Sequence, residues 1–221
     1  VVMKRLIIVV EGQTEQSFVK EILTPYLLCK GIEWTMPVLI RTSRKGRGGF
    51  VNYQHLYNTI KGLLGNPNDS GIVVSSFVDF FRIPNTMPGY SDAMRLGDDI
   101  QRANALQEFL GEAISDRRFV PYIQLHEFEA LLFSNNNGFE YLWDESLSAE
   151  TKLIVDAYPN PEKINSAPET APSKRLLAIN QNYDKVIEGN LIALEVGLKE
   201  MLEKCPRFAD WVTHLIAACA A

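Results

Sequence analysis

The chain has 221 residues, of which 46% are hydrophobic and 22% charged, and its formal net charge is −5. This composition is typical of a folded globular protein and gives no overall attraction to nucleic acid, so any such binding would need a local basic patch or bound metal ions. The three cysteines form no closely spaced pair, which argues against a zinc site or a disulfide framework. No apolar run approaches the roughly 18 residues of a membrane span, and we expect a cytoplasmic protein without membrane contact.

Strands and helices are predicted to alternate through the first 135 residues. Short apolar runs, typical of buried strands, lie at 6–10, 34–40, 71–79 and 119–125. Helical spacing follows each of them: from an N-cap at Thr14 to a stop at Gly31, from 53 to a stop at Gly65, from about 92 to 115, and around 127–133. This order predicts an α/β fold with a mostly parallel, Rossmann-like sheet flanked by helices.

The composition changes after residue 135. Asparagine and proline are frequent up to residue 172, and helical patterns return from residue 173 to the end of the chain. We therefore predict an α/β core over residues 1–135 and a helical C-terminal extension over residues 136–221. The extension is expected to pack on the core as part of one structural unit.

Acidic residues follow three of the predicted strands. Glu11 ends the first apolar run, Asp79 ends the third, and the fourth leads into His126-Glu127-Phe128-Glu129. Ligands of open α/β sheets bind beyond the carboxyl ends of the strands, so these acids are predicted to share one edge. Carboxylates that converge repel one another unless a cation or a shared proton offsets the charge, and this pattern favours a divalent-metal site.

Two of the acids in the first half, Glu15 and Asp79, also have a purely structural interpretation. Glu15 would lie in a first helical turn, where a carboxylate is favourable because of the helix dipole alone. Asp79 could cap a turn or pair with Arg82. Glu11 is harder to explain structurally, because a half-buried acid directly after five apolar residues is costly without a partner.

The segment from His126 to Glu129 leaves several roles open. A zinc-protease motif is excluded because position 130 is Ala where the second His would be needed. Glu127 and Glu129 face the same way only in extended chain and diverge on a helix. His126 could be a ligand, a proton carrier or a structural donor, and the last role is favoured.

Two basic segments are candidates for phosphate contacts. Residues 41–49 combine four cations with glycines that allow close approach of a phosphate backbone. At 173–175, Ser173 is predicted to cap a helix whose free N–H groups suit an anion. A solvated loop and an ordinary surface helix start are the structural alternatives. The candidate cations are Arg41, Arg44, Lys45, Arg47, Lys174 and Arg175.

The chain resembles the TOPRIM superfamily, which includes topoisomerases, bacterial primases and nucleases of the overcoming-lysogenisation-defect class. It is more closely similar to a bacterial family of uncharacterised TOPRIM-like proteins. The segments that carry the resemblance span nearly the whole chain, at 10–15, 77–81, 126–133, 171–176 and 205–211.

The resemblance implies roles for particular residues. Glu11 matches the TOPRIM glutamate, a metal ligand or acid–base group, and Asp79 matches the first Asp of the Asp-x-Asp motif. Position 81 is Phe, so the second Asp of that motif is missing. Glu127 and Glu129 could supply the missing oxygen ligand. No tyrosine nucleophile domain is evident, so topoisomerase activity is not implied, and a separate ATPase partner is expected only by analogy.

The leading hypothesis is a metal-dependent phosphodiesterase, most simply a nuclease acting on DNA or RNA, in a system such as ATPase-linked defence or repair. Mg²⁺ or Mn²⁺ would be held by Glu11, Asp79 and Glu127, with Glu15 and Glu129 as secondary ligands, and the basic segments would hold the nucleic acid. One alternative is a non-catalytic binding subunit of such a complex. Another is a small-molecule phosphotransfer enzyme.

Overall fold

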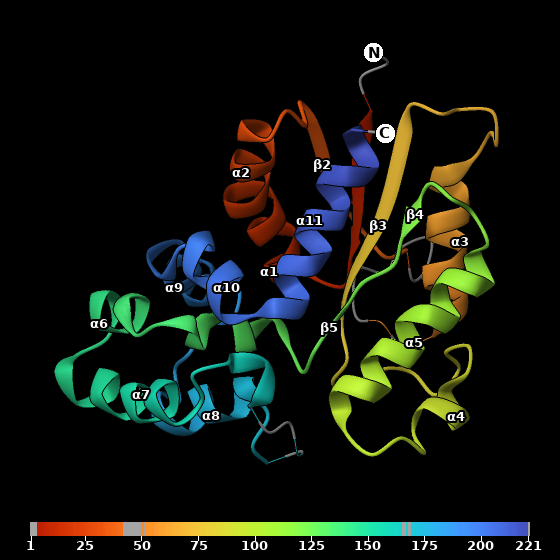
Figure 1. The fold of residues 1–221 in the computed structure, drawn as a ribbon. Coiled ribbons are helices and arrows are strands. Elements are labelled where there is room, and N and C mark those ends of the chain that lie inside the picture. The colour runs from red at the N-terminus through yellow and green to blue at the C-terminus, as the bar shows by residue number, and fades with distance from the viewer. Residues whose placement is uncertain (1–3, 42–49, 51, 165–166, 168, 221) are drawn as a thin grey trace. The chain divides into compact units, whose positions relative to one another are not determined.

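The computed structural model describes residues 4–41, 50, 52–164, 167 and 169–220. The chain divides into two compact units. The first unit comprises Val1–Gln124 together with Val212–Ala221, and the second unit comprises Leu125–Trp211. The first unit thus ends after Gln124 rather than after residue 135, and the last part of the chain returns to it. The two units are described in turn below, with the elements labelled in Figure 1.

The first unit is built on a parallel sheet of five strands with the order β2-β1-β3-β4, and β5 also pairs with β3. The α/β prediction is confirmed. Strands β1 and β3 are central and almost entirely buried, because continuous Val and Ile runs can be covered on both faces. The strands are β1 (Arg5–Val10), β2 (Trp34–Leu39), β3 (Ile72–Asp79), β4 (Phe119–Val120) and β5 (Ile123–Gln124).

Helices cover this sheet, as the ribbon in Figure 1 shows. The last of them, α11, begins in the second unit, and its later residues belong to the first, where Lys4 Nζ donates to the carbonyl of Ala218 at 2.9 Å. The elements are α1 (Gln13–Phe18), the π-helical turn η1 (Val19–Leu23), α2 (Thr24–Cys29), α3 (Tyr53–Leu64), α4 (Tyr90–Ala93), α5 (Asp99–Ile114) and α11 (Pro206–Ala220).

Three local predictions for this unit were wrong. Thr14 lies inside α1, and the helix begins after an extended Gly12 that makes no side-chain cap. The single helix predicted for 92–115 is two helices, because the Asp98 side chain accepts from the Gln101 amide at 2.8 Å and starts α5 anew. The strand predicted for 119–125 is two short strands separated at Pro121, which has no N–H to donate to a sheet.

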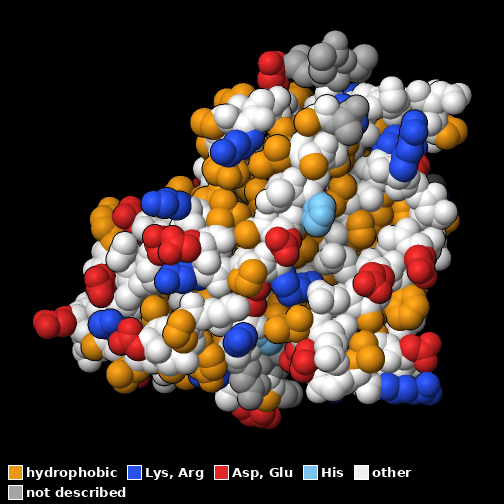
Figure 2. Space-filling model, in the orientation of Figure 1, with side chains coloured by type: hydrophobic (Ala, Val, Ile, Leu, Met, Phe, Trp, Pro, Cys, Tyr) orange, Lys and Arg blue, Asp and Glu red, His pale blue; other side chains and the backbone are white. Residues whose placement is uncertain are grey.

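The outer strand β2 is an open sheet edge. Figure 2 shows hydrophobic side chains gathered over the neighbouring helix α2. Leu28 on α2 is 55% exposed, and Trp34 and Met36 on β2 are 41% and 39% exposed. Pro37 removes one backbone donor from the strand, which limits pairing with a further chain.

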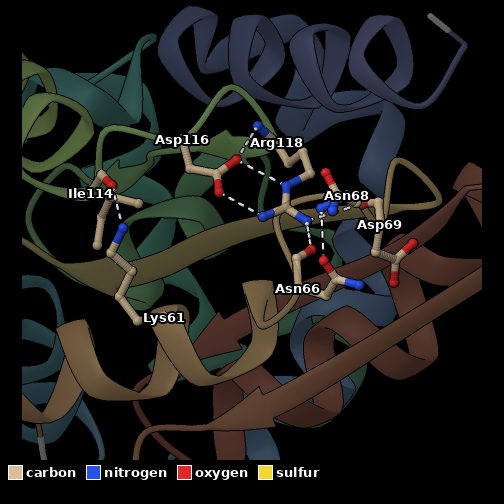
Figure 3. Close-up of polar contacts among 7 residues, drawn as sticks. All are labelled: Lys61, Asn66, Asn68, Asp69, Ile114, Asp116 and Arg118. Atoms are coloured by element: carbon tan, nitrogen blue, oxygen red, sulfur yellow. Dashed lines mark hydrogen bonds and ion pairs between the residues drawn. The ribbon is translucent and has the colours of Figure 1, made fainter.

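A polar network holds the chain before β3 to the chain before β4 (Figure 3). The Arg118 guanidinium donates to the carbonyls of Asn66 and Asp69 at 2.8 and 3.0 Å and to both carboxylate oxygens of Asp116 at 2.9 and 2.7 Å. The hydrogen bonds that Arg118 donates to the Asp116 carboxylate lower the pKa of Asp116 to about 2. Four hydrogen bonds from one guanidinium thus hold together the amino-terminal end of the sheet, opposite the edge where ligands are expected.

The second unit is helical, as expected for the region after residue 135, but it begins earlier. The segment after β5 forms a buried 3₁₀ turn that packs against α8, α9 and α10, so these residues belong to the helical unit. The elements are η2 (Phe128–Ser134), α6 (Asn137–Leu142), α7 (Glu145–Ala157), η3 (Pro161–Lys163), α8 (Pro172–Ile179), α9 (Glu188–Val196) and α10 (Leu198–Lys204).

Aromatic rings and one close backbone approach hold this unit together. Ring centroids lie 5.4 Å apart between Phe133 and Phe139, and 5.3 Å apart between Phe139 and Trp143. A Cβ on Gly138 would lie 2.4 Å from the carbonyl oxygen of Ile192, so helices α6 and α9 can pack this closely only with glycine there. No helix among the described residues of either unit is long and apolar enough to cross a membrane.

Candidate functional site

Glu11 and Asp79 leave the sheet of the first unit at neighbouring strand ends. Val10 on β1 is paired with Phe77 on β3, so Glu11 is level with Val78 and Asp79 follows one residue later. Asp79 is only 7% exposed, and Glu11 Oε1 accepts from the Phe50 amide at 3.4 Å. The register of two parallel strands therefore brings these two acids to one edge, as the sequence predicts.

Glu15 joins them from the first turn of α1, where it is 2% exposed. Its Oε2 lies 2.9 Å from the point that a Cβ on Gly12 would occupy. That oxygen is the end of a flexible side chain, so the short distance shows that the Glu15 carboxylate lies close to the turn at Gly12 and does not by itself require a glycine there.

The donor chemistry of this edge suits a hard cation, since carboxylate oxygens are the groups that Mg²⁺ binds. Among the described residues, however, no group of three or more His, Cys, Asp or Glu side chains is arranged to hold a metal ion. Mg²⁺ commonly keeps several waters and binds through one or two carboxylates together with substrate phosphates. A cation at this edge would therefore need ligands other than the described His, Cys, Asp and Glu side chains alone, such as water or a substrate phosphate.

Phe81, at the position of the missing second Asp, contacts Arg82. The Arg82 guanidinium carbon lies 5.2 Å from the centroid of the Phe81 ring, within the range of a cation–π contact. Arg82 has a φ of 59°, a left-handed conformation that is uncommon for a residue other than glycine. Position 81 thus offers an aromatic face where a second carboxylate was expected.

Glu127, in the second unit, has a partner that the sequence did not reveal. Its Oε2 accepts from the Ser173 amide at 3.0 Å and its Oε1 from the Ser173 hydroxyl at 2.9 Å. The prediction that Ser173 caps its helix was wrong, because the N-cap residue of α8 is Ala171 and makes no side-chain cap. The helix start was predicted to contact a phosphate, but its Ser173 amide and hydroxyl already donate to the carboxylate of Glu127.

Glu129 is fully buried in η2, with an exposed fraction of 0%. Its Oε2 forms an ion pair with Lys185 Nζ at 3.2 Å. Burial and the nearby Glu129 charge both raise the pKa of Tyr183 above its ordinary value. Lys185 had no sequence signal, since it lies in an irregular segment that only the tertiary fold brings to η2.

His126 and Glu162 form a structural pair of contacts in the second unit. His126 has a φ of 66°, and its Nε2 donates to the Glu162 carbonyl at 3.2 Å. The Glu162 carboxylate accepts from the amides of Arg207 and Phe208, both at 3.0 Å, in the first turn of α11. Burial raises the pKa of Glu162. His126 thus acts as a donor to the backbone, the role that the sequence favoured.

The predicted cations differ in their surroundings. Arg41 follows β2 and is exposed, and Arg44, Lys45 and Arg47 lie outside the described residues. Lys174 is exposed on α8. The Arg175 guanidinium already has partners within the protein: its Nε donates to the Thr170 carbonyl at 2.8 Å, and its central carbon lies 5.3 Å from the Tyr158 ring centroid.

The family model described as "Domain of unknown function (DUF4276)" matches residues 10–216. The chain belongs to this family. A search of the curated proteins found no match.

Two solved structures share the fold of this DUF4276 protein. The C-terminal region of the OLD protein of Xanthomonas campestris pv. campestris is 16% identical with a TM-score of 0.53, over 98% of this chain and 94% of that one. The C-terminal region of the Burkholderia pseudomallei OLD protein is 17% identical with a TM-score of 0.50, over 99% of both chains. The expected relation to OLD proteins is therefore confirmed at the level of the fold.

Proposed function

We propose that the chain is a TOPRIM-type phosphodiesterase that cleaves nucleic acid with bound Mg²⁺ or Mn²⁺. The observation that carries the proposal is the pairing of β1 with β3, which places Glu11 and Asp79 at adjacent strand ends of one edge. The fold shared with two OLD C-terminal regions supports it, since the sequence resembles that class of nucleases. The same analogy is the basis for proposing an ATPase partner.

The carboxylates of the first unit create the need for a cation. Glu11, Glu15 and Asp79 concentrate negative charge at this edge, and a substrate phosphate would be repelled from it. Glu11 and Asp79 would hold the metal, and Glu15, folded over Gly12, would add to the negative field. When bound, a divalent cation activates water and offsets the charge that develops on the phosphate.

Glu127 and Glu129 remain in the proposal as further ligands. Their tests must be separate, because Glu127 also accepts two hydrogen bonds at the start of α8 and Glu129 pairs with Lys185. Exposed Arg41 and Lys174 would contact the phosphate backbone, with Arg44, Lys45 and Arg47 as further candidates. Arg175 is a weaker candidate, because its contacts with Thr170 and Tyr158 already use its charge.

The test is cleavage of labelled DNA and RNA, single- and double-stranded, with Mg²⁺, Mn²⁺ or a chelator. Glu11→Gln and Asp79→Asn should each lower the rate by at least about 100-fold, as expected when a group acting at the reacting centre is lost. Glu33→Gln is the matched control, because Glu33 is an exposed acid that precedes β2 at the other end of the sheet. Full activity of Asp79→Asn would refute the assignment.

A non-catalytic binding subunit is the second candidate. It is favoured by Phe81 in place of the second Asp and by the lack of any three-ligand group among the described residues. Such a subunit would bind nucleic acid or a partner ATPase without turnover. Binding that is equal for wild type and Asp79→Asn, together with no cleavage in the presence of the partner, would support it over the nuclease.

A further inference from the structure

A cavity of about 270 Å³ lies in the first unit between β2 and α3. Its walls are Val38 on β2, Arg41 just after the strand, and one face of α3 carrying Asn58, Thr59, Gly62 and Leu63. The volume is below the range of about 300–1,000 Å³ that holds drug-sized ligands, so only a smaller group would fit.

The position of the cavity ties it to the proposed active edge. Val10 on β1 is paired with Leu39 on β2, and the Ile40 amide donates to the Val10 carbonyl at 3.0 Å. Arg41 therefore follows Ile40 at the same edge as Glu11, one strand away, and neighbouring strands are about 4.8 Å apart. A group in this cavity would be adjacent to a phosphate held near Glu11.

The polar side chains that line the cavity differ in how far their hydrogen-bonding groups are already used. Thr59 Oγ1 is used internally, since it accepts from the Arg41 amide at 3.2 Å and donates to the His55 carbonyl at 2.8 Å. Asn58 Oδ1 accepts from Gln54 Nε2 at 2.8 Å, and this contact orients the amide and leaves its Nδ2 as the donor. Among the described residues, no acidic side chain forms an ion pair with Arg41.

A glycine in the middle of a helix, Gly62, lines the cavity. It lies inside α3, where glycine costs about 0.8–1.0 kcal/mol relative to alanine. A Cβ at this position would meet no atom within 4 Å, so packing does not require the glycine. Gly62 is exposed and lines the cavity, so a side chain at this position would project into open space beside the cavity wall.

We infer that this cavity receives one unstacked nucleobase of a single-stranded nucleic acid. Val38 and Leu63 would contact the base face, the planar Arg41 guanidinium would stack on the base or bind the adjoining phosphate, and Asn58 Nδ2 would donate to the base edge. A base inside a duplex cannot enter, because its faces are covered by its neighbours. The inference rests on the proposed function and narrows its substrate to single-stranded or locally unpaired nucleic acid.

The test is fluorescence anisotropy with three labelled probes: a short single strand, a strand of abasic phosphodiesters of the same length, and a duplex of the same sequence. Binding is measured with chelator and with Ca²⁺, so that no cleavage is required. Wild type should prefer the base-bearing strand over the abasic one by roughly five- to a hundredfold, the range of one stacked base. Gly62→Leu, which fills the cavity, should remove this preference and retain binding of the abasic strand.

Ala149→Leu is the matched control, since Ala149 is exposed on helix α7 of the second unit and gains the same side chain. It should keep the preference. Equal binding of base-bearing and abasic strands by wild type, a preference retained by Gly62→Leu, or no nucleic-acid binding at all would overturn the inference. Base-dependent binding without any cleavage would instead keep it and count against the nuclease.

Discussion

The carboxylate of Glu127 accepts hydrogen bonds from both the amide and the hydroxyl of Ser173, at 3.0 and 2.9 Å. A residue beside η2 thus caps a helix that begins far along the chain. The contact gives Glu127 a role in stability that is separate from any metal ligation. Stability and activity measurements on the same variants can therefore distinguish the two roles.

Glu127→Ala is expected to destabilise the protein by about 1–2 kcal/mol, because the first turn of α8 loses its acceptor. Urea unfolding followed by circular dichroism measures this loss. Glu150→Ala, at an exposed position of α7, is the control and should stay within about 0.5 kcal/mol of wild type. An unchanged urea midpoint for Glu127→Ala would show that the cap contributes nothing.

Lys174 and Arg175 are adjacent cations that should behave differently. Lys174→Ala should weaken nucleic-acid binding for all sequences and reduce the salt slope of log K by about 1, as for a phosphate contact. Arg175→Ala should mainly lower stability, because Arg175 is bonded to Thr170 and stacked on Tyr158. Salt titrations of binding and urea unfolding of both variants test the contrast, which a reversed pattern would contradict.

The Asp116–Arg118 network should give a defined acid dependence. The folded-state pKa of Asp116 is lowered from 3.8 to about 2, so its contribution is present above pH 3.8 and is lost as the pH falls through about 2. Asp116→Asn should cost about 1.5–3 kcal/mol at neutral pH. Unfolding at a series of pH values should show the difference between wild type and variant disappearing near pH 2.

Two glycine-to-alanine changes should have opposite effects. Gly138→Ala forces a Cβ to within 2.4 Å of the Ile192 carbonyl and should cost about 1–3 kcal/mol through overpacking. Gly62→Ala meets no atom within 4 Å and should stabilise the protein by up to about 1 kcal/mol. Urea unfolding of both variants checks the signs, and a destabilising Gly62→Ala would show that the glycine has a structural role in α3.

The strands around Glu11 and Asp79 and the parallel α/β class could be predicted from the amino-acid sequence. Continuous apolar runs have few alternatives to buried strands, and parallel strands must end at a common edge. Gly31 and Gly65 likewise marked helix ends correctly, since both adopt a positive φ. These features depend on local preference and periodicity, which the order of residues carries directly.

The partners of the polar groups could not be predicted from the sequence, because they depend on the tertiary fold. The Glu127–Ser173, Glu129–Lys185 and Glu162–Phe208 contacts join residues that are distant in sequence. The unit boundary after Gln124 and the open space at Gly62 depend in the same way on which elements pack together. A carboxylate has the same sequence signature whether it binds a metal, caps a helix or pairs with a lysine, because its role is set by the groups that the fold brings to it.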